Sequence, residues 1–199
     1  MFKRKKTPSI IIGIFFIIFG ITAIINSIYI GSLERIFWFC YAGLILMGIG
    51  IISDNGEIVA SQLAILTIPF IFWNIDFFYL LFTKQTLWGI TNYFFNAESN
   101  NLDRIITFQH VFTLPLAYAF LFFHKPKRKD FWIISLIQIF IFYIIGILFT
   151  SPESNINCVF KSCLSVTFPG PYPITWFIIF GLIIGITSLA LIKIFYKKK

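Results

Sequence analysis

One carboxylate and one imidazole lie deep within apolar stretches of the sequence, and together they could perform acid–base chemistry. Asp76 belongs to the stretch 58–82 and His110 to the stretch 105–123. If these stretches cross a membrane in opposite directions, both side chains lie about 7–9 Å below the outer boundary. A carboxylate beside an imidazole orients and charges the ring, and the two side chains form an acid–base unit. We therefore predict an intramembrane acid–base pair, and the alternative is a buried pair that only joins two helices.

Four more polar side chains fall in the same half of the predicted bilayer. Thr107 lies three residues before His110, on nearly the same helical face, and is a candidate nucleophile. Asn74, Gln109 and Asn26 could bind substrate, and Asn74 or Gln109 could donate to a developing oxyanion. Unsatisfied polar groups in hydrocarbon are costly, so these side chains are expected to face one another. The sequence thus predicts a polar pocket open to the outer face.

The cysteines suggest other chemistry. Cys40, near the outer end of its stretch, and the deeper Thr67 are alternative nucleophiles, although packing or backbone hydrogen bonding explains either residue as well. Cys158 and Cys163 share a loop on the predicted outer side, where oxidising conditions permit a disulfide, and two free thiols are the alternative. A zinc site needs four ligands, and no nearby His or paired Cys completes such a set. We therefore expect no metal and no cofactor.

The composition identifies the class of protein that positions these residues. Of 199 residues, 58% are hydrophobic and only 12% are charged, which excludes a soluble globular domain and a disordered chain. Each of six apolar stretches has the roughly 17–25 residues that a helix needs to cross a bilayer. We predict an all-α integral membrane bundle that forms a single domain over 1–199. Its helices are expected at 9–30, 36–52, 58–82, 105–123, 131–150 and 174–195.

The basic residues predict the orientation. Of the 16 Lys and Arg residues, twelve fall on the side of both termini and four on the other side. This bias predicts cytoplasmic termini in a multi-pass protein of the cell membrane. The basic clusters lie at helix ends and not on a folded face, so nucleic acid is not expected as a partner. The twelve are Lys3, Arg4, Lys5, Lys6, Lys125, Lys127, Arg128, Lys129, Lys193, Lys197, Lys198 and Lys199, and the four are Arg35, Lys84, Arg104 and Lys161.

Short matches along the chain add a family resemblance. The matching residues are Thr67-Ile68-Pro69 before Asn74, His110 with Leu114-Pro115-Leu116, and Asn157 with Val159-Phe160 before Gly170-Pro171-Tyr172-Pro173. In these the chain resembles the YwaF-like small polytopic membrane proteins and the androgen-induced family of membrane lipid hydrolases. The resemblance implies six helices and an intramembrane His, paired with a Thr or Cys nucleophile, that acts on lipid esters or acyl chains. It carries over to His110 and Thr67, while the stretch 73–76 lacks a Cys.

Three functions remain open from the sequence. The first is a lipid hydrolase or acyltransferase that acts on membrane lipid through His110. The second is a non-catalytic partner or assembly protein that binds another membrane protein through the long outer loops 83–104 and 151–173. The third is a small-solute transporter, which would need polar groups through both halves of the bilayer. The inner half offers only Gln62, Gln138, Thr187 and Ser188.

Overall fold

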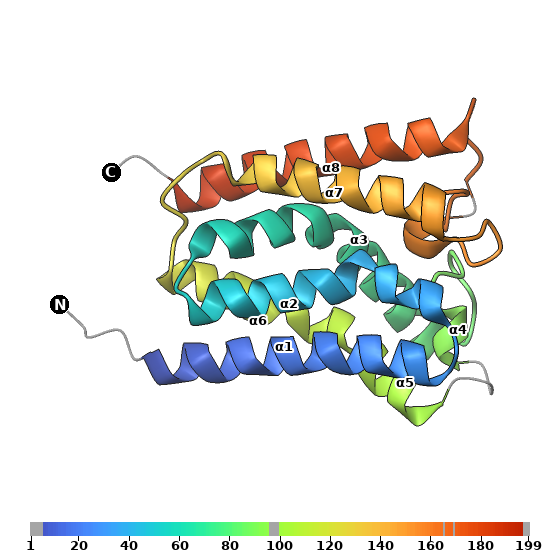
Figure 1. Ribbon diagram of the computed structural model, residues 1–199, viewed down its shortest axis with the longest axis horizontal. Coiled ribbons are helices and arrows are strands. Elements are labelled where there is room, and N and C mark those ends of the chain that lie inside the picture. Colours follow the sequence, from blue (N-terminus) through green and yellow to red (C-terminus); the bar gives the residue numbers. More distant parts are fainter. Residues whose placement is uncertain (1–5, 96–99, 165, 169, 197–199) are drawn as a thin grey trace.

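The computed structural model describes residues 6–95, 100–164, 166–168 and 170–196, and these residues form helices joined by loops, without a β-strand (Figure 1). Consecutive long helices alternate in direction, so that α1 begins and α8 ends at the same end of the bundle. The elements are α1 (Lys6–Tyr29), the 3-10 helix η1 (Leu33–Phe37), α2 (Phe39–Ile52), α3 (Gly56–Thr83), α4 (Asn92–Phe95), α5 (Asn101–Thr107), α6 (Gln109–Phe123), α7 (Phe131–Phe149), the 3-10 helix η2 (Ile156–Cys158) and α8 (Tyr172–Phe195).

Five of these helical segments are long and apolar enough to cross a membrane: α1, α3, α5 with α6, α7 and α8. The predicted class, an all-helical multi-pass membrane protein, is confirmed at this level. The helix α2 is shorter than predicted for 36–52, because residues 33–37 form η1 and Trp38 is extended. Its 14 residues reach about 21 Å, less than the roughly 30 Å hydrocarbon core of a bilayer. The Asn157 side chain accepts the Phe39 amide at 2.9 Å and so satisfies the start of α2.

The predicted helix 105–123 is interrupted and begins earlier. Asn100 caps α5 by accepting the Asp103 amide at 2.7 Å, which starts the helix at Asn101. The chain breaks at Phe108 between α5 and α6. The bounds of the other long helices differ from the predicted ones by three residues at most.

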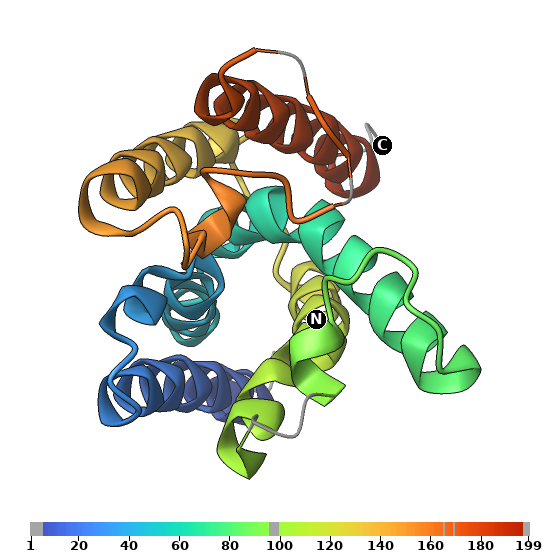
Figure 2. The same cartoon turned by 90° about the vertical axis from the view of Figure 1, so that its right-hand side faces the viewer.

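The first half of α3 lies at the centre of the bundle, with α2, α6, α7 and α8 around it (Figure 2). Two amide side chains join α3 to α7 there: Gln62 donates to Gln138 at 2.8 Å and Gln138 donates back at 3.0 Å. The helices α1 and α2 pack closely through glycines. A Cβ added at Gly48 would lie 2.5 Å from the carbonyl oxygen of Gly13.

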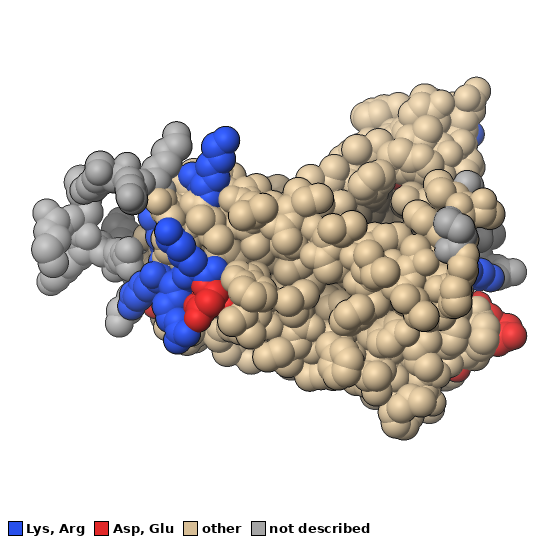
Figure 3. Space-filling view, turned by 90° about the horizontal axis from the view of Figure 1, so that it is seen from above, with Lys and Arg blue, Asp and Glu red and all other residues tan. Residues whose placement is uncertain are grey.

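The sides of the bundle are apolar, as a lipid-facing surface requires. On the face seen in Figure 3, Lys and Arg gather at the end where α1 begins, and Asp and Glu lie at both ends. The exposed basic residues of the α6–α7 loop belong to this basic end: Lys125, Lys127, Arg128 and Lys129. Lys3, Arg4, Lys5, Lys197, Lys198 and Lys199 lie outside the described residues.

Candidate active site around His110

Asp76 on α3 is only 1% exposed, and its carboxylate binds the loop that follows the helix. One oxygen accepts the Trp88 amide at 2.7 Å and the Gly89 amide at 3.2 Å. The other accepts both the amide and the hydroxyl of Thr91 at 2.8 Å. The predicted pair with His110 is therefore not formed. A buried carboxylate needs several donors, and the backbone of the returning loop supplies them without a second charge.

His110 is held by a backbone carbonyl. Its Nδ1 lies 2.7 Å from the carbonyl oxygen of Thr107. This oxygen is accessible because the helix breaks at Phe108, so that the Val111 amide donates to Phe108 and not to Thr107. A carbonyl oxygen only accepts hydrogen bonds, so Nδ1 carries the proton of the neutral ring. The lone pair then lies on Nε2, which is the arrangement of a general base.

Aromatic side chains fix the plane of this imidazole. The Trp73 ring stacks on His110 with centroids 4.5 Å apart, and the Phe70 ring lies 4.4 Å away. Trp73 Nε1 donates to the Tyr93 hydroxyl at 3.1 Å, and that hydroxyl also interacts with the Thr107 side chain. The exclusion of water from the hydroxyl raises the pKa of Tyr93 to about 12, although part of its ring is exposed. We refer to these five residues as the His110 cluster.

Two predicted substrate-binding amides are engaged by the protein itself. Asn74 donates to the backbone carbonyl of His110 at 2.8 Å and to a carbonyl of its own helix, so that it joins α3 to α6. Asn26 donates to the Asp103 carboxylate at 2.6 Å and joins α1 to α5. The expectation that both amides face one common pocket is therefore wrong, because each has a closer partner on a neighbouring helix.

Gln109 differs from these amides because its polar atoms have no hydrogen-bond partner among the described residues. The side chain is 0% exposed, as is Thr113 one turn further along α6, whose hydroxyl also has no partner there. The Cys40 thiol of α2 lies beside the Gln109 amide, but the contact does not meet hydrogen-bond geometry. We refer to Cys40, Gln109 and Thr113 as the Gln109 site.

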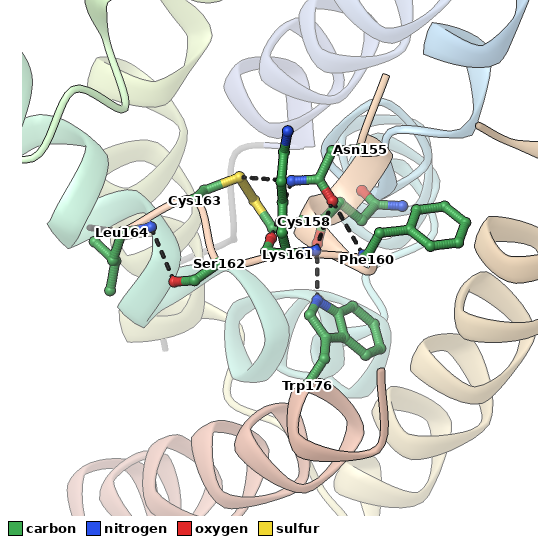
Figure 4. The surroundings of a disulfide bond; sticks show 9 residues. Asn155, Cys158, Phe160, Lys161, Ser162, Cys163, Leu164 and Trp176 are labelled. Carbon is green, nitrogen blue, oxygen red and sulfur yellow. Dashed lines mark hydrogen bonds between the residues drawn. A yellow bond between two sulfur atoms is a disulfide. The ribbon is translucent and has the colours of Figure 1, made fainter. Parts of the chain in front are cut away.

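The loop between α7 and α8 is closed by a disulfide between Cys158 and Cys163 (Figure 4). Asn155 accepts the amides of Phe160 and Lys161 at 3.0 and 3.1 Å and so shapes the turn beside it. Trp176 of α8 donates to the Asn157 carbonyl at 2.8 Å. The loop is therefore fixed to the end of the bundle where α8 begins.

Two surface hollows of the described chain lie away from the His110 cluster. One is an apolar groove between α2 and α7, and the other lies under the disulfide loop. The groove is lined by Leu46, Ile134, Ile137, Gln138, Ile141 and Phe142, and the second hollow by Phe160, Lys161, Ser162, Leu164, Val166, Thr167, Phe168 and Tyr172. The predicted outer-leaflet pocket does not coincide with either of them.

The sequence alone did not identify Trp73, Phe70 or Tyr93 as partners of His110. The depth of Trp73 within its stretch was the available signal, whereas Tyr93 belongs to the long loop 83–104, where no pattern indicates a partner. Among the described residues, no group of three or more His, Cys, Asp and Glu side chains could hold a metal ion. No protein-family model, curated protein or solved structure matches the chain.

Proposed function

We propose that the protein crosses the cell membrane six times, with both termini in the cytoplasm. In this topology α2 also crosses the membrane, in addition to the five long helical segments. The helix η1 and Trp38 extend α2 towards the outer surface. The support is the charge distribution: the exposed Lys and Arg of the α6–α7 loop lie at the end where α1 begins and α8 ends. Basic residues concentrate in cytoplasmic loops of membrane proteins.

Within this topology, we propose a lipid hydrolase or acyltransferase that acts on outer-leaflet lipid esters, with His110 as general base. The observation that carries the proposal is the 2.7 Å contact between His110 Nδ1 and the Thr107 carbonyl. This contact orients the ring and directs the Nε2 lone pair away from the Thr107 carbonyl. Thr107 thus takes the orienting role first predicted for Asp76, through its backbone and not its hydroxyl.

Lipid reaches this imidazole from the side. His110 is half-buried, and its neighbours Ile105 and Phe108 are 57% and 46% exposed on the lipid-facing surface. An ester at the level of the outer headgroups therefore needs to move only a short distance between α3 and α6.

The proposed reaction has one proton acceptor and one carbonyl electrophile. His110 Nε2 takes a proton from water, or from an acceptor alcohol, as its oxygen attacks the ester carbonyl. The bond from the carbonyl carbon to the leaving alkoxide then breaks, and the imidazolium returns the proton to that alkoxide. The Tyr93 hydroxyl accepts from Trp73 and also interacts with the Thr107 side chain, so it holds the Trp73 ring against the imidazole during the reaction.

The test is ester turnover by the purified protein in liposomes that carry a fluorogenic acyl lipid in the outer leaflet. Replacing His110 by Ala should lower turnover at least about 100-fold, the usual contribution of a general base. His124→Ala is the matched control, since His124 is the other histidine and binds Asp54 at the opposite end of α6. Full turnover by His110→Ala, or none by the unmodified protein, would contradict the assignment.

A second candidate function is a non-catalytic partner of another membrane protein. The observation in its favour is the fixed outer surface: Asp76 binds the loop after α3, and the disulfide closes the loop after α7. Such a surface suits protein recognition without chemistry. The liposome assay separates the two functions, because a partner protein turns over no ester.

A further inference from the structure

The Gln109 site presents hydrogen-bonding capacity that the surrounding protein does not use. A primary amide has two N–H donors and an oxygen with two lone pairs, and a threonine hydroxyl both donates and accepts. None of these groups is bonded within the described part of the chain, although both side chains are 0% exposed. Buried polar groups in native proteins are nearly always paired with protein or with ordered water.

Other polar side chains at this end of the bundle are engaged elsewhere. Asn74 bonds to the His110 carbonyl, Asn26 bonds to Asp103, and four donors saturate Asp76. The Cys40 thiol lies beside the amide without hydrogen-bond geometry. Asn74, Asn26 and Asp76 are therefore not available to the Gln109 site.

We propose that the Gln109 site binds internal water in the outer half of the bundle. Water is both donor and acceptor, and internal water molecules usually make about three hydrogen bonds to groups that are otherwise unsatisfied. Cys40, Gln109 and Thr113 offer that number of partners on α2 and α6. A charged ligand is disfavoured because the site contains no charged side chain, and a lipid is disfavoured because both α6 side chains are fully enclosed.

The Gln109 site is inferred from its buried polar groups alone, and the inference does not depend on any activity of His110. One consequence does rest on the proposed function. Gln109 precedes His110 in the chain, so water bound here would lie next to the helical turn that carries the proposed base. A hydrolase in the membrane needs a supply of water for the reaction.

The test is radiolytic hydroxyl-radical footprinting of the full chain in nanodiscs, because X-rays generate radicals from bound water that modify the adjacent side chains. Cys40 and Met47 are a matched pair: both carry reactive sulfur, both lie on α2, and they are 6% and 0% exposed. Both residues belong to the same buried apolar cluster, and Cys40 alone of the two lies beside the Gln109 amide, so we expect Cys40 to be modified several-fold faster than Met47. Equal, slow modification of both would overturn the proposal.

A double variant shows whether the α6 side chains hold this water. Gln109→Met with Thr113→Val keeps the shapes of the side chains and removes their polar atoms. The rate at Cys40 should then fall to that at Met47. An unchanged rate would mean that bulk water reaches the thiol, which also overturns the proposal.

The sign of a stability change gives a second, independent measurement. If the Thr113 hydroxyl were dry and unpaired, Thr113→Val would raise the Tm, since it would remove a desolvated polar group. If the hydroxyl binds water, the same change lowers the Tm. A higher Tm for Thr113→Val in nanodiscs would therefore contradict the proposal without any measurement of turnover.

Discussion

The imidazole of His110 lies almost parallel to the indole of Trp73, with ring centroids 4.5 Å apart and an interplanar angle of 19°. Trp73 is itself only 4% exposed, and its Nε1 is bonded to the Tyr93 hydroxyl. One side chain of α3 therefore orients a ring on α6 and also ties α4 to the bundle. This double role makes Trp73, and not a charged residue, the main partner of the imidazole.

Trp73→Phe and Trp73→Ala separate these two roles. Phe keeps a stacked ring but loses the hydrogen bond to Tyr93, so we expect a loss of about 1 kcal/mol in unfolding free energy. Ala also removes the packed ring and should cost about 3–5 kcal/mol. Chemical unfolding in micelles measures both values. If Phe proves as destabilising as Ala, the bond to Tyr93 dominates and the stacking contributes little.

Asp76→Asn tests the carboxylate as a binding group for the loop. The asparagine amide keeps one acceptor oxygen but replaces the other with an NH₂ group, which cannot accept a hydrogen bond. Some of the donors from Trp88, Gly89 and Thr91 therefore lose their acceptor. We expect a loss of about 1–3 kcal/mol and faster hydrogen exchange of the amides at 88–91. Ester turnover should persist, since Asp76 does not contact His110.

Glu153→Gln is the matched control for that experiment, because Glu153 is an exposed outer-loop carboxylate. It should leave exchange at 88–91 unchanged. Loss of turnover in Asp76→Asn with intact protection of the loop would restore a catalytic role for the carboxylate.

The error over Asp76 has a geometric cause in the bounds of one helix. The apolar pattern predicts a start at Ile105, whereas α5 begins at Asn101 because the polar residues Asn100 and Asp103 form its cap. Four residues correspond to about 6 Å along a helix. His110 therefore lies deeper than predicted and faces Trp73, one turn below Asp76. Apolar length alone could not locate a helix start made of polar residues.

Other features were accessible to sequence reasoning to different degrees. The long helices follow from the apolar runs, because backbone N–H and C=O groups in lipid must bond to one another within the segment. The Cys158–Cys163 bond was one of two alternatives that spacing and side of the membrane allowed. The partners of Asn26 and Tyr93 depend on where a long outer loop returns to the bundle, and no local pattern encodes that return.

Glu34 on η1 predicts a pH-dependent contact at the outer surface. Its carboxylate accepts the Ser151 amide and hydroxyl and the Ser154 hydroxyl, and these bonds lower the pKa of Glu34 below 4.5. The stabilisation is complete above that unfolded-state value and is lost as the pH falls through the lower folded-state pKa. We expect the amide of Ser151 to lose hydrogen-exchange protection only in this acidic range.

Glu34→Gln provides the comparison at each pH. The variant should show reduced protection of Ser151 already at neutral pH and no further loss on acidification. If the unmodified protein and the variant lose protection in parallel, another carboxylate controls the loop.

The Gln62–Gln138 pair predicts strongly non-additive effects of mutation in the inner half of the bundle. Each amide satisfies the other at 2.8 and 3.0 Å, and the two are 0% and 8% exposed. Gln138→Leu leaves the buried Gln62 oxygen without a donor, while the Gln62 NH₂ group keeps its bond to the Ser61 hydroxyl at 3.1 Å. This change should cost about 1–3 kcal/mol, and Gln62→Leu, which leaves the Gln138 amide unpaired, a similar amount. The double variant leaves neither group unpaired, so its loss should be smaller than the sum of the single losses. Chemical unfolding of the four proteins gives the coupling energy, and additive losses would mean that other groups satisfy the two amides.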